Sequence, residues 1–97
     1  MRERYIMKLE IRAERAFNAL KKIGAPVNHL GEGWSGDALF SISGEDNYPE
    51  IWADYYRLDI DELSFGVSEK ITKVLDKYKL YCEWYNPGVL DVYDASF

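Results

Sequence analysis

Hydrophobic residues recur at helical spacing in two stretches of this chain, residues 3–23 and residues 64–78. In each stretch an apolar side chain returns every three or four positions, which predicts an amphipathic helix. Four shorter stretches are rich in apolar and aromatic residues and are bounded by turn residues, as strands are. The predicted strands are 26–31, 38–43, 79–85 and 89–94. The order of elements is therefore helix, strand, strand, and then the same again.

Two helix–hairpin units of this kind can bury their apolar faces only together. A hairpin with strands of about six residues cannot cover its own apolar side. We therefore predict an α+β fold, αββαββ, in which both hairpins join in one four-stranded antiparallel sheet and both helices cover one face of it. This topology is a circular permutation of the ferredoxin-like arrangement. The other face would carry tyrosines and carboxylates together: Tyr81, Glu83, Tyr85, Asp91 and Tyr93.

An aromatic segment, residues 47–56 (NYPEIWADYY), lies between the two units. Asn47 can cap a helix, and Pro49 suits the first helical turn. The apolar residues of this segment fall on one side of a helix better than on one face of a strand. We predict a short inserted helix at about 48–57.

The rings of this segment have two interpretations. Buried rings would supply the core area that a small domain needs. Exposed rings beside carboxylates would instead suit recognition of another protein. Both interpretations hold if Trp52 points inward while Tyr48 and Tyr56 point outward, which is our prediction.

Charge is distributed unevenly along the chain. Residues 1–24 carry seven Lys or Arg against three Glu, a balance of +4. Residues 25–66 carry nine Asp or Glu against Arg57 alone, a balance of −8. Residues 67–97 balance at −1, and the whole chain carries −5. The acidic middle repels duplex nucleic acid and anionic membranes, and it attracts basic protein surfaces.

These patterns together predict a small acidic, non-enzymatic interaction module that binds a basic protein partner. The residues predicted to contact that partner are aromatic or acidic: Trp34, Tyr48, Asp54, Tyr56, Asp59, Asp61 and Glu62. A narrower version is an inhibitor whose carboxylates imitate nucleic-acid phosphates, as small acidic proteins of mobile elements or immunity systems do. A homodimer, with the basic first helix against the acidic middle of a second copy, is also compatible with the charges.

Two further alternatives stay open at this stage. One is a small ligand-binding domain or enzyme that uses carboxylates and His29, the only histidine. The other is a nucleic-acid binder that uses the basic first helix and the tyrosines of the sheet. Glu83 and Asp91 lie among those tyrosines and oppose this last alternative, so direct nucleic-acid binding is not expected.

Several chemistries are disfavoured by what the chain lacks. His29 and Cys82 cannot supply the three or four ligands of a usual zinc site. The acidic run 59–62 lacks the calcium-loop pattern, and the glycines of 31–36 lack the known phosphate-binding motifs. We therefore predict no catalytic residue, metal or cofactor. No apolar stretch is long enough for a membrane span, and we expect a single cytoplasmic domain, 1–97, with Cys82 buried.

Overall fold

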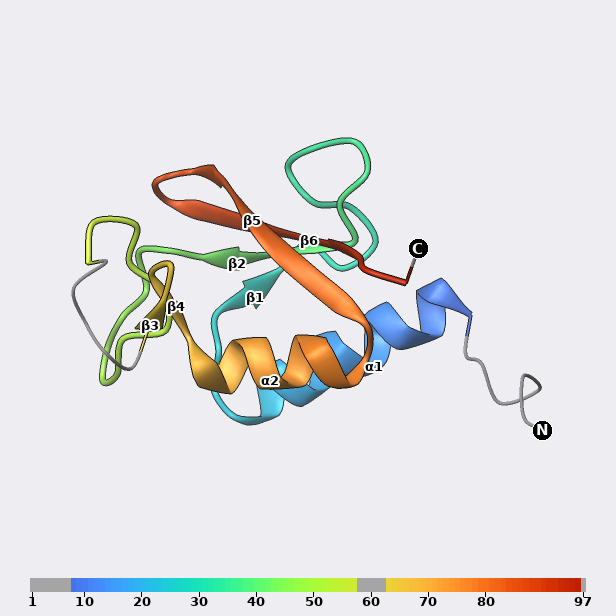
Figure 1. Ribbon diagram of the computed structural model, residues 1–97, viewed down its shortest axis with the longest axis horizontal. Coiled ribbons are helices and arrows are strands. Elements are labelled where there is room, and N and C mark those ends of the chain that lie inside the picture. The colour runs from blue at the N-terminus through green and yellow to red at the C-terminus, as the bar shows by residue number, and fades with distance from the viewer. Residues whose placement is uncertain (1–7, 58–62, 97) are drawn as a thin grey trace.

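The computed structural model describes residues 8–57 and 63–96, and it places two α-helices against one face of a four-stranded antiparallel sheet (Figure 1). The elements in chain order are α1 (Leu9–Lys22), β1 (Val27–Asn28), β2 (Phe40–Ser43), β3 (Leu63–Ser64), β4 (Val67–Ser68), α2 (Glu69–Lys77), β5 (Leu80–Asn86) and β6 (Val89–Asp94). The predicted α+β class and four-stranded antiparallel sheet are confirmed. β3 and β4 pair with each other in a separate ribbon.

The sheet has the strand order β1-β2-β6-β5, so each hairpin contributes one central and one edge strand. The hairpins meet where β2 pairs with β6. In that ladder Phe40 lies opposite Val92, and both side chains are fully buried. Side chains alternate between the two faces along a strand. Ser41 and Asp91, the next pair in the ladder, therefore lie on the face that the helices leave open.

The core lies between the helices and the sheet. Both helices contribute residues at three- and four-residue spacing, and the central strands contribute every second residue. The fully or nearly fully buried side chains of this core include Ala16, Leu20, Phe40, Ile42, Ile71, Leu75, Leu80, Leu90 and Val92. Removal of this apolar surface from water is the main favourable term in folding, about 25 cal/mol for each Å².

The ends of both helices are set by local signals. Gly24 follows α1 with φ of +96°, the left-handed conformation that glycine adopts without steric cost. The N–H of Ala25 then donates back to the carbonyl of Leu20. At the start of α2, the hydroxyl of Ser68 accepts a hydrogen bond from the N–H of Lys70, as a capping serine does.

Several predicted boundaries differ from the structure. The second helix begins at Glu69 rather than at residue 64, because the residues before it form the β3–β4 ribbon, which turns at Phe65 and Gly66 with positive φ. The first helix begins at Leu9 within the described residues, and residues 3–7 of the predicted helix lie outside them. β1 has two residues because His29, with φ of +60°, turns the chain away.

The short helix predicted at about 48–57 is wrong. Asn47 does not cap a helix, and its side chain instead closes a loop. Its Oδ1 accepts from the N–H groups of Trp52 and Ala53 at 2.9 and 3.2 Å, and its Nδ2 donates to the carbonyl of Ala53 at 2.9 Å. The amide side chain thus satisfies backbone groups that a helix would have satisfied internally.

The backbone after this loop pairs with a distant segment instead of coiling. Ala53 forms an isolated β-bridge with Val67 of β4, and the N–H of Asp54 donates to the carbonyl of Gly66 at 2.7 Å. Tertiary pairing therefore overrides the helical spacing of the apolar residues. The predicted orientation of the rings is confirmed, because Trp52 is 4% exposed while Tyr48 and Tyr56 are 92% and 75% exposed.

The long loop between β1 and β2, residues 29–39, is tied to the helix-free face of the sheet. The carboxylate of Asp91, fully buried, accepts the N–H groups of Trp34 and Ser35 at 2.9 and 2.8 Å. The hydroxyl of Ser35 also lies 2.8 Å from that of Tyr93. Two successive N–H groups aimed at one carboxylate form a small anion-binding concavity, and here the anion is the protein's own side chain.

Candidate interaction surface

Three aromatic rings project from the segment between β2 and β4. Tyr48, Phe65 and Tyr56 are 92%, 85% and 75% exposed, far more than most large apolar side chains in a folded domain. Tyr48 comes from the loop that Asn47 closes, Tyr56 from the turn that follows Asp54, and Phe65 from the β3–β4 turn. These rings, with the neighbouring Glu45, Asp46 and Asp54, are called the acidic-aromatic surface below.

A partly buried support lies beneath two of these rings. Tyr55 packs edge-on against Tyr56 at 5.3 Å between ring centroids, and edge-on against Trp84 of β5 at 5.4 Å. The indole N–H of Trp84 donates to the carbonyl of Phe65 at 3.1 Å. Edge-to-face aromatic contacts are favourable, so the ring of Tyr56 and the backbone of Phe65 rest on an ordered base.

The carboxylates in and around the predicted site differ in burial and in the groups that they contact. Asp54 is half-buried, and its Oδ1 accepts the N–H of Tyr56 at 3.0 Å, which holds the tyrosine in place. Glu50 is engaged in an exposed ion pair with Lys70 at 3.0 Å. Among the described residues no ion pair involves Glu45, Asp46 or Asp54. The remaining predicted carboxylates, Asp59, Asp61 and Glu62, lie outside the described residues.

Trp34, the remaining predicted contact residue, belongs to a different cluster. It projects from the 29–39 loop and is 55% exposed. Its ring contacts are with His29 and Tyr85, each at 6.0 Å between ring centroids. The structure thus brings Tyr48, Asp54 and Tyr56 together on one segment and places Trp34 with the aromatic residues of the helix-free sheet face.

A small cavity of about 180 Å³ opens beside Trp34. His29, Glu45 and Asp46 line it together with residues of β1 and β2 and with the turn between β5 and β6. No hydrogen bond joins His29 to either carboxylate within the described part of the chain, so no acid–base relay is assembled there. The sequence singled out His29 without its neighbours, because only the fold brings residues 45 and 46 beside it.

A larger cavity of about 570 Å³ lies at the start of α2. Its lining is mixed, with Ile51 and Leu63 as the apolar part and Glu50, Lys70 and Lys73 as the charged part. Lys70 also lies 5.6 Å above the ring of Trp52. The lysines near this cavity are engaged with Glu50 and Glu69, so the charge around it is largely neutralised.

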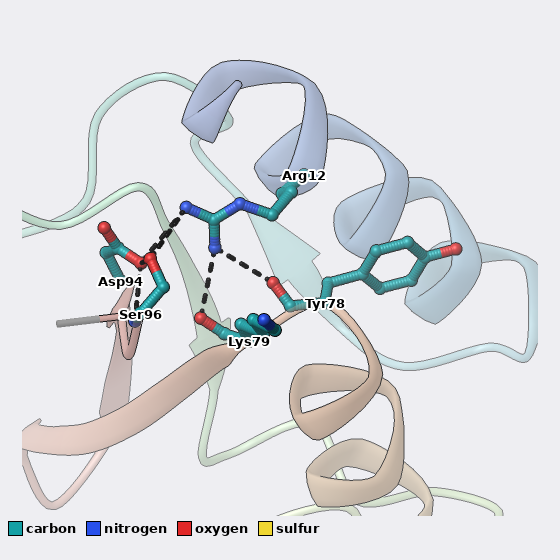
Figure 2. A network of polar contacts seen from close by, with 5 residues as sticks. All are labelled: Arg12, Tyr78, Lys79, Asp94 and Ser96. Atoms are coloured by element: carbon teal, nitrogen blue, oxygen red, sulfur yellow. Dashed lines mark hydrogen bonds and ion pairs between the residues drawn. The ribbon is translucent and has the colours of Figure 1, made fainter. Parts of the chain in front are cut away.

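The basic first helix is less free than its sequence indicates. Arg12 is 8% exposed and spans three parts of the fold (Figure 2). Its Nη1 donates to the carbonyls of Tyr78 and Lys79 at 3.0 and 3.2 Å, and its Nη2 reaches Asp94 and Ser96, each at 3.2 Å. Arg12 therefore does not contribute to an open basic face of α1, because its guanidinium serves as an internal clamp.

The clamp also sets the ionisation of its carboxylate. Hydrogen bonds from the side chain and backbone of Ser96, with the Arg12 guanidinium beside them, hold the pKa of Asp94 below its usual range. Asp94 is partly exposed, so solvent weakens the ion pair. The arrangement fixes the end of β6 against α1 and offers no group for chemistry.

Cys82 faces the core side of β5 and is half-buried. Burial, with smaller contributions from Glu83 and Asp76, raises the pKa of its thiol to about 12. A thiol of this kind is protonated and unreactive near neutral pH. In residues 8–57 and 63–96, no three His, Cys, Asp or Glu side chains gather as a metal site requires. Neither described helix is long and apolar enough to cross a membrane.

Sequence reasoning missed two contributors to these surfaces. Phe65 lies in a turn that was predicted as helix, so its exposure could not be anticipated. Tyr85 was placed on the correct sheet face, but its contact with Trp34 depends on the course of the 29–39 loop. The glycines of that loop were the available signal, because they allow the backbone to approach the sheet closely.

Comparison with protein families, with curated proteins and with solved structures finds no match to this chain. The class that its fold defines is an α+β protein with a four-stranded antiparallel sheet and two helices on one face. Its function is therefore argued below from its own surfaces.

Proposed function

We propose that this protein is a non-enzymatic interaction module that binds a basic protein partner through the acidic-aromatic surface. The observation that carries the proposal is the exposure of Tyr48, Phe65 and Tyr56 on a segment that has an ordered aromatic base. Tyrosine and other aromatic residues are enriched at the centres of protein interfaces. A solvated loop without a binding role would not need three projecting rings.

Charge supports a basic partner rather than an acidic one. Residues 25–66 have a balance of −8, and within the described part Glu45, Asp46 and Asp54 form no ion pair. Such carboxylates steer cationic surfaces toward the rings and raise the association rate, while the rings provide most of the contact area. Asp59, Asp61 and Glu62 would add to the same field.

The test uses a short lysine- and arginine-rich peptide as the probe and fluorescence anisotropy as the measurement. The wild-type protein should bind this peptide at low salt and release it at high salt, since the steering charges are screened. Tyr48→Ser/Tyr56→Ser should weaken binding about tenfold or more, as the loss of interface anchors does. Tyr85→Ser removes a tyrosine on another face that is 51% exposed, so it serves as the control and should leave binding unchanged.

The proposal would be refuted by either of two results. One is peptide binding that is identical in the wild type and in Tyr48→Ser/Tyr56→Ser. The other is clear binding of a single-stranded oligonucleotide at low salt, which would favour a nucleic-acid binder. An inhibitor that imitates nucleic acid is a narrower form of the same proposal, since it would also meet a basic surface with carboxylates.

A second candidate function is binding of a small molecule in the cavity beside Trp34. It is supported by one observation, that His29, Glu45 and Asp46 line the same space. The volume of about 180 Å³ is below the range of about 300–1,000 Å³ that is usual for ligand sites. A thermal-shift screen of small cations, compared between wild type and His29→Ala, tests it. Equal shifts in both proteins would remove this candidate.

A further inference from the structure

The two edges of the main sheet differ in a way that points to self-association. β1, at one edge, has two residues, follows Pro26 and ends at His29 in the left-handed conformation. β5, at the other edge, has seven residues, Leu80–Asn86, and contains neither proline nor lysine. Short strands, prolines and charges are the usual protection of an exposed edge. β1 has such protection along its whole length, whereas β5 has only the single charge of Glu83 and an irregularity after Trp84, which leaves residues 80–84 open.

The outward backbone groups of β5 can be identified from the hydrogen-bond pattern. The N–H of Ala95 donates to the carbonyl of Lys79. Residues that exchange hydrogen bonds alternate along an antiparallel ladder, so Tyr81 and Glu83 direct their backbone groups toward β6. The residues between them direct N–H and C=O groups away from the sheet: Leu80, Cys82 and Trp84. Among the described residues nothing pairs with these groups.

A groove beside this edge leaves room for another strand. It has a volume of about 190 Å³ and lies between α2 and β5. Thr72, Leu75 and Asp76 line it from the helix, while Phe65 and Trp84 line its far end. α2 therefore stands back from the edge, and the side chains of an added strand could enter the groove. Addition of a strand to an open edge is a common mode of recognition.

We propose that β5 pairs antiparallel with β5 of a second copy of this chain, about a two-fold axis at Cys82. In this register Leu80 lies opposite Trp84 of the second copy, and Cys82 lies opposite its own equivalent. All these residues face the groove side, where Leu80 of the second copy is buried beside Trp84 and Phe65. A two-fold interface repeats every contact twice.

Side-chain pairing on the helix-free face of the sheet favours this register over its alternatives. It places Tyr81 opposite Glu83 of the second copy, so that a phenol can donate a hydrogen bond to a carboxylate in each half. A register centred on Glu83 would instead place two carboxylates directly opposite each other, which is destabilising. The identity of the occupant also follows from charge. Residues 67–97 balance at −1, so two copies meet here with little repulsion, whereas two acidic middles would repel.

The acidic-aromatic surface and the paired edge meet at Phe65 and at Trp84, whose indole N–H donates to the carbonyl of Phe65. A test of dimerisation must therefore leave the rings of that surface in place, and a failure to dimerise would not contradict the proposed binding function. For this reason the substitutions below avoid Phe65, Tyr48 and Tyr56.

The first experiment measures mass against concentration by sedimentation or light scattering. The wild-type mass should rise with concentration from 11.3 kDa toward that of two chains. Tyr81→Glu should raise the dimer dissociation constant about tenfold or more, because two carboxylates then oppose each other in each half. Tyr81→Lys is the matched control. It removes the same ring but places a cation opposite Glu83, so it should dimerise at least as well as wild type.

A charge exchange checks the register. Tyr81→Glu/Glu83→Lys should restore dimerisation, since each half then pairs a carboxylate with a cation in place of the two opposed carboxylates. In amide hydrogen exchange, the N–H groups of Leu80, Cys82 and Trp84 should gain protection as concentration rises. Those of Tyr81 and Glu83, which face β6, should be protected throughout.

Three results would overturn the proposal. They are a mass that stays at 11.3 kDa at every concentration, equal dimerisation of Tyr81→Glu and Tyr81→Lys, and exchange at Leu80, Cys82 and Trp84 that does not depend on concentration. Capture of an unrelated extended peptide by a monomeric β5 edge would likewise assign the edge to another occupant.

Discussion

The two hairpins of this protein occupy corresponding positions in the chain but are held in different ways. The second, β5–β6, has strands of seven and six residues joined by a tight turn at Pro87 and Gly88. The first, β1–β2, has strands of two and four residues joined by the 29–39 loop. The second hairpin has a long ladder of its own, whereas the first has few ladder hydrogen bonds.

The difference shows how a short hairpin can still be ordered. The loop of the first hairpin folds over the helix-free face and binds the buried carboxylate of Asp91, which belongs to the second hairpin. Gly33 makes this approach possible, because a Cβ there would lie 2.2 Å from the Cβ of Ala38. The first hairpin therefore depends on the second for hydrogen bonds that its own short ladder cannot supply.

The largest loss of stability should come from removing the hydrogen bonds by which Asp91 links the two hairpins. Asp91→Ala leaves the N–H groups of Trp34 and Ser35 without their acceptor in a buried setting, and should lower the free energy of unfolding by about 3 kcal/mol. Urea unfolding followed by circular dichroism measures this loss. Glu83→Ala, the exposed neighbour of Asp91 across β5 and β6, is the control and should cost less than about 0.5 kcal/mol. Equal costs for the two substitutions would contradict the dependence of the first hairpin on Asp91.

A smaller loss of stability should follow from replacing glycines of the two hairpins by alanine. Gly33→Ala forces the loop away from Ala38 and Asp91 and should cost about 2 kcal/mol, as overpacking does. Gly36→Ala in the same loop meets nothing within 4 Å and should change stability by less than about 0.5 kcal/mol.

Gly88, in the turn of the second hairpin, provides the substitution to compare with Gly33→Ala. A Cβ at Gly88 would come closest to the end of the flexible Glu45 side chain, at 2.8 Å, with Oδ1 of Asn86 at an ordinary contact distance of 3.5 Å. Gly88→Ala should therefore cost less than Gly33→Ala when the same unfolding measurement is used. A larger loss of unfolding free energy for Gly88→Ala than for Gly33→Ala would contradict this difference between the hairpins.

The smallest effect concerns pH and the base of the second hairpin. The folded state depresses the pKa of Asp94, so its carboxylate contributes stability above the unfolded pKa of about 3.9. That contribution is lost as pH falls through the lower folded pKa. The unfolding midpoint of the wild type should thus decline more steeply below about pH 4 than that of Asp94→Asn. Parallel declines would show that the clamp on Asp94 does not stabilise the fold.

Periodicity along the chain was sufficient to predict the class, both helices and the strand pairs of the sheet. It also assigned the faces of β5 correctly, since alternation depends only on the local backbone. It failed at residues 47–57, where Ala53 pairs with Val67 and the N–H of Asp54 donates to Gly66. The helical spacing there did not mark a buried face, because Trp52 is buried while Tyr55 and Tyr56 are 42% and 75% exposed.

The candidate site was likewise predictable only where it does not depend on contacts between distant parts of the chain. Exposure of Tyr48 and Tyr56 was predicted by assigning Trp52 to the core and the two tyrosines to recognition, and this exposure is confirmed. The separation of Trp34 from them could not be foreseen, because it depends on the loop that Asp91 anchors. Arg12 was misplaced for a similar reason, since its acceptors are 66 to 84 residues away in the sequence.

The Arg12 clamp has a consequence for the order in which the chain becomes stable. Its guanidinium caps the carbonyls at the end of α2 and reaches Ser96, near the end of the described chain. During synthesis, which proceeds from the N-terminus, α1 emerges first but acquires these acceptors only after nearly all of the chain has followed. Non-local contacts of this kind form late because chain closure must precede them. The first helix to be made is thus expected to be among the last to dock.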